Sequence, residues 1–112
     1  MKESFSQAEI CEQYGSLLDP PGADQRLGIA LSTLGLLPLN ALRHQAENGT
    51  CGWYIWGGEL LDAPDFFAPL HFNHLAEYAP ALIPFMGLSP GWRVLLAPGQ
   101  TDVWYDPALL SV

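Results

Sequence analysis

The sequence predicts a single α+β domain in which short helices pack against a small, mostly antiparallel sheet. Its 112 residues are the length of one typical domain, and ten prolines and eleven glycines divide it into short elements. Strand-like runs at 92–96 and 101–105 flank a turn at 98–100, which predicts an antiparallel hairpin. We expect residues 1–26 to form an N-terminal helix and loop, and residues 27–112 to form the α+β core.

The first predicted helix begins at Ser6, because Ser6 and Glu9 have the spacing of a capping box. Apolar residues then recur at helical spacing as far as Leu18. Pro20 disfavours a helical conformation at the residue before it, so we expect this helix to end at Asp19.

Residues 27–48 are predicted to form a strand, a loop and a second helix. The apolar run 27–31 favours a buried strand, although its glycine and alanine leave a helix open. Pro38 suits the first turn of a helix, and Asn48-Gly49 suits the end of one. We therefore expect a helix from Pro38 to Asn48.

The most aromatic stretch of the chain is predicted to be the central strand. Alternation along residues 50–56 places Trp53 and Ile55 on one face. Tyr54 and Trp56 then fall on the opposite face. Because both faces are apolar, we expect the strand to be covered on two sides.

A loop rich in carboxylates is predicted after this strand. The glycine pair at its end allows a turn, and three acidic residues follow, which are Glu59, Asp62 and Asp65. From Asp65 the chain regains helical character, and we expect short helices as far as Gly87. A last helical turn is expected after Asp106.

The chain carries a formal charge of −8, from twelve acidic and four basic residues. The cations do not cluster along the chain; they are Lys2, Arg26, Arg43 and Arg93. Because phosphate groups are bound through Lys and Arg, direct binding to nucleic acid or to an anionic membrane is not expected. A basic protein partner would instead be steered toward this acidic surface.

The cysteines and the N-terminus indicate a cytoplasmic protein with reduced thiols. Cys11 and Cys51 alone do not make a disulfide framework, and the polar N-terminus lacks the apolar core of a signal peptide. The longest uncharged run, residues 27–42, is shorter than the roughly 20 residues that a membrane span needs.

Two histidines offer an alternative function, that of a small metal-dependent or hydrolytic enzyme. His71 and His74 would lie one turn apart on a predicted helix at 71–78, where they could provide two metal ligands. The further ligand would come from one of three donors, Cys51, Glu59 or His44. No spacing requires such a site, and a packed or solvated histidine is the simpler interpretation. The enzyme would use His71, His74 and Glu59.

Other groups could also carry chemistry. Cys51 and a histidine would make a nucleophile and base, but the start of an apolar strand favours a buried thiol. An acid/base pair of the glycosidase kind could come from the carboxylates Glu59, Asp62, Asp65, Asp102 and Asp106. Asp65 and Asp106 are more simply helix caps. Glu59 and Asp62 lie near aromatic residues predicted to be exposed, which suits the rim of a protein-binding surface.

Several motifs between Pro38 and Leu110 together resemble one protein family. They are Gly52-Trp53-Tyr54-Ile55-Trp56-Gly57-Gly58-Glu59, Asp65-Phe66-Phe67, Pro80-Ala81-Leu82-Ile83-Pro84-Phe85-Met86-Gly87-Leu88, Pro90-Gly91-Trp92-Arg93 and Asp102-Val103-Trp104-Tyr105-Asp106. With these motifs the chain resembles the bacterial immunity proteins of polymorphic toxin systems, specifically the thirty-third numbered immunity family, formerly a domain family of unknown function.

The resemblance implies a non-enzymatic inhibitor that binds a cognate toxin stoichiometrically and shields its active site. It carries over no catalytic residues, and no cofactor is expected. A basic, nuclease-like toxin would complement the acidic charge. We expect the contact at aromatic and acidic residues, which are Trp56, Glu59, Asp62, Asp65, Asp102 and Trp104. A structural subunit or dimerisation module remains the further alternative.

Overall fold

The computed structural model describes residues 6–47, 49–61, 63 and 65–111. Within them the chain forms one α-helix, α1 (Gln7–Tyr14). The strands are β1 (Arg26–Ile29), β2 (Leu39–Arg43), β3 (Thr50–Gly57), β4 (Ala68–His71), β5 (Trp92–Ala97) and β6 (Gln100–Tyr105). The 3-10 helices are η1 (Leu31–Thr33), η2 (Phe72–Glu77), η3 (Pro80–Phe85) and η4 (Pro107–Ser111). No helix of these residues is long and apolar enough to cross a membrane.

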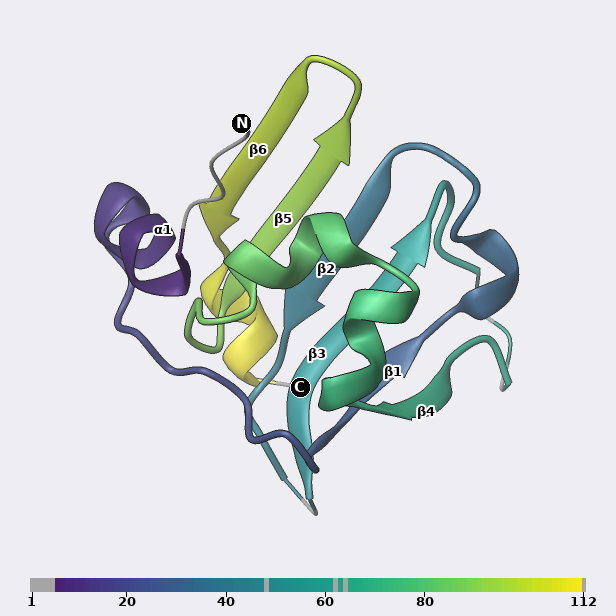
Figure 1. Cartoon of the computed structure of the whole chain (residues 1–112), viewed down its shortest axis with the longest axis horizontal. Coiled ribbons are helices and arrows are strands. Elements are labelled where there is room, and N and C mark those ends of the chain that lie inside the picture. The colour runs from purple at the N-terminus through teal and green to yellow at the C-terminus, as the bar shows by residue number, and fades with distance from the viewer. Residues whose placement is uncertain (1–5, 48, 62, 64, 112) are drawn as a thin grey trace.

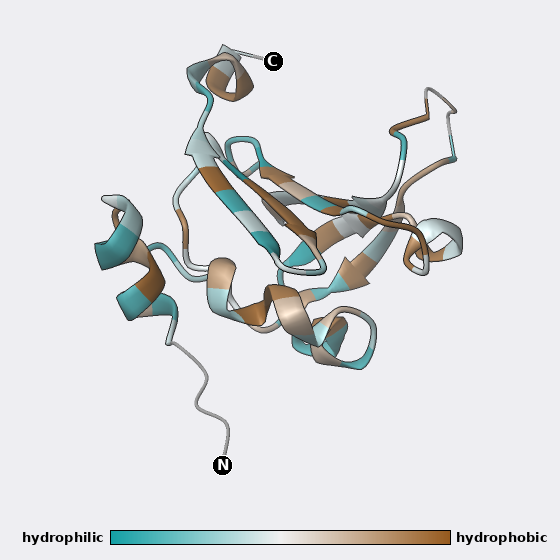
Figure 2. Ribbon diagram, turned by 90° about the horizontal axis from the view of Figure 1, so that it is seen from above, coloured by the Kyte–Doolittle hydropathy of each residue, from teal (hydrophilic) through white to brown (hydrophobic). Residues whose placement is uncertain are grey.

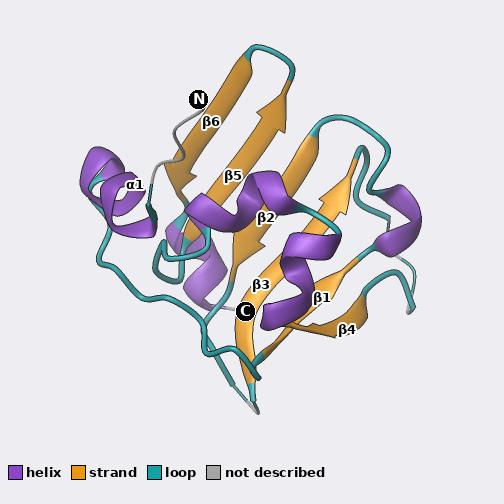
Figure 3. Ribbon diagram, in the orientation of Figure 1, coloured by secondary structure: helices purple, strands orange, loops and turns teal. Residues whose placement is uncertain are grey.

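The strands form one sheet in the order β4-β1-β3-β2-β5-β6 (Figure 1). Neighbouring strands are antiparallel except for β1 and β3, which run parallel. The short helices η2 and η3 lie across this sheet, and α1 lies beside its β5–β6 end (Figure 3). The prediction of an α+β fold with a mostly antiparallel sheet is therefore confirmed.

β3 is the central strand that its alternation predicted. It is hydrogen-bonded to β1 on one edge and to β2 on the other. Trp53 and Ile55 are fully buried in the main core. Tyr54 and Trp56 belong to a second apolar cluster on the opposite face. Both faces of β3 are therefore covered, as expected for a strand that is apolar on both sides.

The main core lies between the sheet and a layer formed by α1, η2 and η3. Ile10 of α1, Leu75 of η2 and Leu82 of η3 are buried in the same cluster as Trp53. The indole Nε1 of Trp53 donates a hydrogen bond to the carbonyl of Met86, at 3.0 Å. This bond replaces the hydrogen bond to water that the indole N–H loses when the tryptophan is buried.

Arg43 is a cation buried in this core at the end of β2. Its Nε donates to the carbonyl of Cys51 at 2.8 Å, and its Nη1 donates to the carbonyls of Asp19 and Leu88, each at 2.7 Å. The guanidinium also lies 5.6 Å from the ring centroid of Trp53. Burial lowers the pKa of Arg43, since it disfavours the charged form. Three chain segments are thus joined by one side chain.

The first helix begins as predicted but is shorter than expected. Ser6 Oγ accepts from the backbone N–H of Glu9, and Glu9 accepts from the backbone N–H of Ser6, so the capping box is confirmed. The helix ends at the left-handed C-cap Gly15, whose φ is 86°, and not at Asp19. Leu17 is 80% exposed, so the apolar spacing that suggested a longer helix does not continue into the core.

The predicted helix from Pro38 to Asn48 is wrong. Its first half is the strand β2, which is hydrogen-bonded between β3 and β5, while Asn48 lies outside the described residues. Ala41 faces the main core and Leu42 the opposite face, as the alternation of a strand requires. Pairing with two distant strands therefore outweighs the local signals for a helix start and stop.

The helical character expected directly after Asp65 is also wrong. The chain there enters β4, which pairs with β1 at the edge of the sheet. An edge position tolerates Pro69, which has no N–H to donate. Asp65 consequently caps no helix, and the helical turns begin only with η2.

The remaining predicted elements are confirmed. The apolar run after residue 26 forms β1, so the helix that its composition left open does not occur there. β5 and β6 form the expected hairpin around a turn at Pro98-Gly99. The last turn follows Asp106, whose Oδ1 accepts from the backbone N–H of Ala108 at 3.1 Å.

Candidate functional site

The side of the sheet that faces away from the main core is only partly covered. Figure 2 shows α1, η2 and η3 on one side of the strands, and η4 with the loop after β3 on the other. Strand pairing places two rows of residues across this second side. The first row is Trp56, Asn40, Leu95 and Asp102, and the second, next to it, is Tyr54, Leu42, Arg93 and Trp104. We call this side the open face.

Three of the residues predicted to contact a partner lie on the open face: Trp56, Asp102 and Trp104. β2 and β5 separate β3 from β6, so Trp56 and Asp102 are three strand spacings, or roughly 14 Å, apart. A standard interface of about 800 Å² per partner is roughly 30 Å across and would span both. The open face therefore brings residues distant in the sequence within one footprint.

Trp56 is less accessible than the sequence suggested. It is 4% exposed, because the loop after β3 folds back and sets the ring of Phe67 edge-on against it, with centroids 6.1 Å apart. The expectation of an exposed aromatic at this position is wrong. Trp56 instead forms the wall of a hollow on the open face.

This hollow has a volume of about 210 Å³ and a mostly apolar lining. We call it the Trp56 hollow; it is lined by Leu42, His44, Tyr54, Trp56, Leu60 and Phe67. Among its walls, His44 has its Nδ1 3.0 Å from the carbonyl of Leu109 and its ring against Tyr54. The polar atoms of the wall are thus partly engaged within the protein, and an apolar group fits the hollow best.

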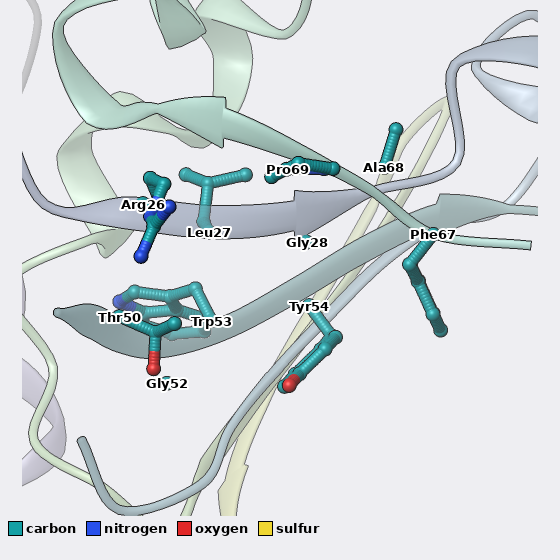
Figure 4. A pocket seen from close by; sticks show the side chains of 10 residues that line it. All are labelled: Arg26, Leu27, Gly28, Thr50, Gly52, Trp53, Tyr54, Phe67, Ala68 and Pro69. Carbon is teal, nitrogen blue, oxygen red and sulfur yellow. The ribbon is translucent and has the colours of Figure 1, made fainter. Parts of the chain in front are cut away.

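A second hollow, also of about 210 Å³, lies beside the first. Figure 4 shows its ten lining residues, with Tyr54 and Phe67 extending to the same side of the strands next to Gly28, which has no side chain. We call it the Gly28 hollow. Tyr54 and Phe67 line both hollows and make a T-shaped pair, with centroids 5.2 Å apart. This aromatic pair is therefore the ridge between them.

The loop after β3 adds negative charge beside the Trp56 hollow. Glu59 and Asp65 are both exposed. Leu60, next to Glu59, lines the hollow, and so does Phe67, two residues after Asp65. Asp62, the third predicted acidic contact, lies outside the described residues. The two acids that can be placed are therefore exposed and within two residues, along the chain, of a wall of the hollow, and we call them the rim acids.

The far side of the open face carries a second group of aromatic and charged residues. Trp104 is 39% exposed and lies under the guanidinium of Arg93, 5.4 Å from its ring centroid. Arg93 Nη1 also donates to Asp106 Oδ2 at 3.2 Å. Asp102 accepts from the side chain of Gln100 at 2.7 Å. Arg93 therefore holds the ring of Trp104 in place at the surface.

Exposed leucines continue the apolar surface at the end of the sheet nearest the Trp56 hollow. Leu60 and Leu61 are each 51% exposed, Leu36 is 55% exposed and Leu37 is 62% exposed. The segments join there, because the N–H of Gly58 donates to the carbonyl of Pro38 at 2.8 Å. The exposed leucines of the segments 36–37 and 60–61 therefore flank this link.

The residues of the alternative enzyme are not brought together. His71 pairs with Arg26 of β1, and Arg26 pairs with Thr50, so His71 lies at the Thr50 end of β3. Glu59 follows the opposite end of that strand, whose seven steps from Thr50 to Gly57 span roughly 23 Å. In the part of the chain that the structure describes, no three His, Cys, Asp or Glu side chains gather around a point where a metal could bind.

Cys51 does not pair with a histidine base. It is fully buried on the face of β3 that packs against the helices, whereas the ring of His44 lies on the open face against Tyr54, at 5.5 Å. Burial raises the pKa of the Cys51 thiol and keeps it protonated. The interpretation of Cys51 as a small buried hydrophobe therefore agrees with the structure.

Several walls of the Trp56 hollow had no signal of their own in the sequence. Leu42 was assigned to a helix, so its place on the open face could not be seen. Leu60 and Phe67 reach the hollow through the path of a loop, which has no periodicity to read. Tyr54 alone could have been found, because alternation already placed it on the same face as Trp56.

The open face thus combines an apolar hollow with aromatic and acidic residues on an acidic α+β scaffold. The family model described as Imm33-like domain matches residues 6–106. The chain therefore belongs to the Imm33-like family, whose name marks a family of immunity proteins, and the resemblance noted in the sequence is confirmed. No curated protein and no solved structure was found to match the chain.

Proposed function

We propose that this chain is an immunity protein that binds a cognate toxin and neutralises it by direct contact. The observation that carries the proposal is the match of residues 6–106 to the Imm33-like domain. An inhibitor of this kind acts stoichiometrically and needs no catalytic group, so its function depends on the affinity of one surface. In this proposal the whole chain acts as one immunity domain in the cytoplasm, where its thiols stay reduced.

The charge of the chain supports a basic toxin as the partner. Twelve acidic residues against four basic ones give a formal charge of −8. Opposite charge steers a basic partner to the surface and raises its rate of association. A nuclease has a cationic cleft for its polyanionic substrate, and an acidic inhibitor competes for that cleft. A nuclease-like domain is therefore the toxin class that we propose.

The contact surface in this proposal combines the open face with the loop after β3. Trp56, Asp102 and Trp104 belong to the open face, and Glu59 and Asp65 to the loop. What supports this choice is the combination of an apolar hollow with exposed aromatic and acidic residues, since aromatic anchors surrounded by polar groups dominate binding energy in interfaces.

The proposal is tested by co-expression with the toxin domain encoded immediately upstream of the gene, scored by cell survival. We expect the wild-type chain to protect cells and to co-purify with the toxin at one-to-one stoichiometry. If cells die as readily with the chain as without it, the proposal fails.

Trp104→Ala sharpens this test, with Tyr105→Ala as its matched control. The two aromatics are neighbours of similar exposure, 39% and 47%. They point to opposite faces of β6, because Trp104 pairs with Arg93 and Tyr105 with Trp92. We expect Trp104→Ala to weaken toxin binding about tenfold or more and Tyr105→Ala to leave it nearly unchanged, as measured by calorimetry. The reverse order of effects would place the contact on the helix side.

A further inference from the structure

We propose that the Trp56 hollow receives one apolar side chain of the toxin, presented by a segment that carries Lys or Arg beside it. The inference rests on the proposed function and adds to it the chemistry of the segment that docks. Three observations carry it, which are the lining of the hollow, the charge at its rim and the apolar surface that continues from it.

The lining and size of the hollow select a single apolar side chain. Trp56, Tyr54 and Phe67 form aromatic walls, and Leu42 and Leu60 add aliphatic ones. The volume of about 210 Å³ is below the range of about 300–1,000 Å³ typical of pockets for small organic ligands. A leucine, isoleucine, phenylalanine or methionine side chain matches both the chemistry and the size.

The charge around the hollow selects a basic segment. Glu59 and Asp65 are exposed on the loop that supplies two of its walls. Two cations in the described part of the chain lie away from this loop: Arg93 is paired with Asp106, and Arg26 lines the neighbouring Gly28 hollow. A segment entering from the loop side therefore meets two carboxylates, which Lys or Arg next to the apolar anchor would neutralise.

The leucines beside the hollow extend the surface that the segment covers. Leu60 is both a wall of the hollow and one of the exposed leucines, so the apolar lining and the outer apolar surface are continuous. Leu36 lies against Gly58, since its Cβ is 3.2 Å from the position of a Cβ built on that glycine. The hollow is therefore continuous, through Leu60, with exposed apolar surface beside it.

Leu60 and Leu61 provide a matched pair of variants for the test. Both side chains are 51% exposed on the same loop. Of the two, Leu60 is among the residues that line the hollow and Leu61 is not. We would compare Leu60→Asp with Leu61→Asp, measuring affinity for the upstream toxin domain by calorimetry and folding by circular dichroism. We expect Leu60→Asp to weaken binding about tenfold to a hundredfold and Leu61→Asp to change it less than about threefold.

A spectroscopic measurement tests the same inference without a substitution in the loop. In the wild-type chain labelled with 5-fluorotryptophan, we expect the fluorine resonance of Trp56 to shift on toxin binding. The resonance of Trp53, fully buried on the opposite face, should stay in place. Trp56→Phe assigns the first resonance and Trp53→Phe the second.

The outcomes separate this inference from the proposed function. If the wild-type chain neither binds the toxin nor protects cells, the proposed function is overturned and the inference with it. If the wild type binds but Leu60→Asp has wild-type affinity and the Trp56 resonance does not move, the inference alone is overturned. A toxin-free dimer that Leu60→Asp dissociates would also overturn it, because the occupant would then be a second copy of this chain.

Discussion

The ring of Tyr54 in β3 lies directly on Gly28 in β1, its register partner. A Cβ on Gly28 would stand 2.6 Å from Tyr54 Cδ1 and 3.4 Å from the Cβ of Phe67. The φ of Gly28 is outside the left-handed region, so space and not backbone conformation requires a glycine there. The absence of a side chain lets the Tyr54–Phe67 ridge form between the two hollows of the open face.

Gly28→Ala is therefore expected to destabilise the fold and to disturb the open face. The new methyl group displaces the ring of Tyr54, and overpacking of this kind lowers the free energy of unfolding by about 1–3 kcal/mol. Urea unfolding would measure the loss. Gly35→Ala is the control, since no atom lies within 4 Å of a Cβ there, and we expect a change within about 0.5 kcal/mol. Equal stability of the two variants would contradict the close contact.

Reversing the charges at the rim of the Trp56 hollow should slow toxin binding. We expect the double variant Glu59→Lys, Asp65→Lys to lower the association rate constant about tenfold at low salt, because steering depends on the local potential. Stopped-flow mixing with the toxin domain measures the rate, and the difference should shrink in high salt.

The control variant changes the net charge by the same amount, but at two other acidic residues. Glu12→Lys, Asp24→Lys reverses two exposed acids, one on α1 and one in the loop before β1. We expect this variant to slow association less than the rim variant does. Equal slowing by both would show that net charge, and not the position of the acids, governs the encounter.

Arg43→Met should destabilise the protein strongly although it replaces a charge with an apolar side chain. The buried carbonyls of Cys51 and Leu88 would lose their donor, and so would the carbonyl of Asp19 at the edge of the core. Leaving buried acceptors unpaired lowers the free energy of unfolding by about 2–4 kcal/mol in total. Arg93→Met removes a surface ion pair and should cost less than about 1 kcal/mol. Urea unfolding curves that coincide for the two variants would refute the role of Arg43.

The two buried thiols should make stability fall at alkaline pH. Burial raises the pKa of both Cys11 and Cys51, so the unfolded chain, with thiols that titrate near 8.5, loses protons first. The unfolded state then binds fewer protons than the native state, and the free energy of unfolding decreases as pH rises above about 8.5. Denaturant unfolding between pH 7 and pH 10 measures the slope. A Cys11→Ala, Cys51→Ala variant with an unchanged slope would refute this assignment.

Local patterns were enough to predict some of the elements. The capping box of Ser6 and Glu9, the alternation of β3 and the β5–β6 hairpin each depend on residues close in the chain, and each is present. The acidic charge and the family motifs were equally readable, because neither depends on how the chain folds.

Two elements whose strand form depends on distant partners, β2 and β4, were predicted wrongly. β2 has proline and asparagine-glycine signals at its flanks that also suit a helix, and its strand form follows from pairing with β3 and β5. β4 is a strand because it adds to the edge of β1, although its own four residues include Pro69. Such pairing energy has no trace within a short window of sequence.

The residues of the candidate site also fall into two groups, those that the sequence identifies and those that only the fold brings together. The acids and aromatics that mark it, from Trp56 through Glu59 to Trp104, could be named from composition and motif alone. The hollow beside them exists because Leu42, from a strand mistaken for a helix, and Leu60 and Phe67, from an irregular loop, meet around Trp56. Side chains become neighbours through strand order and loop path, and both are set by non-local packing that no local pattern encodes.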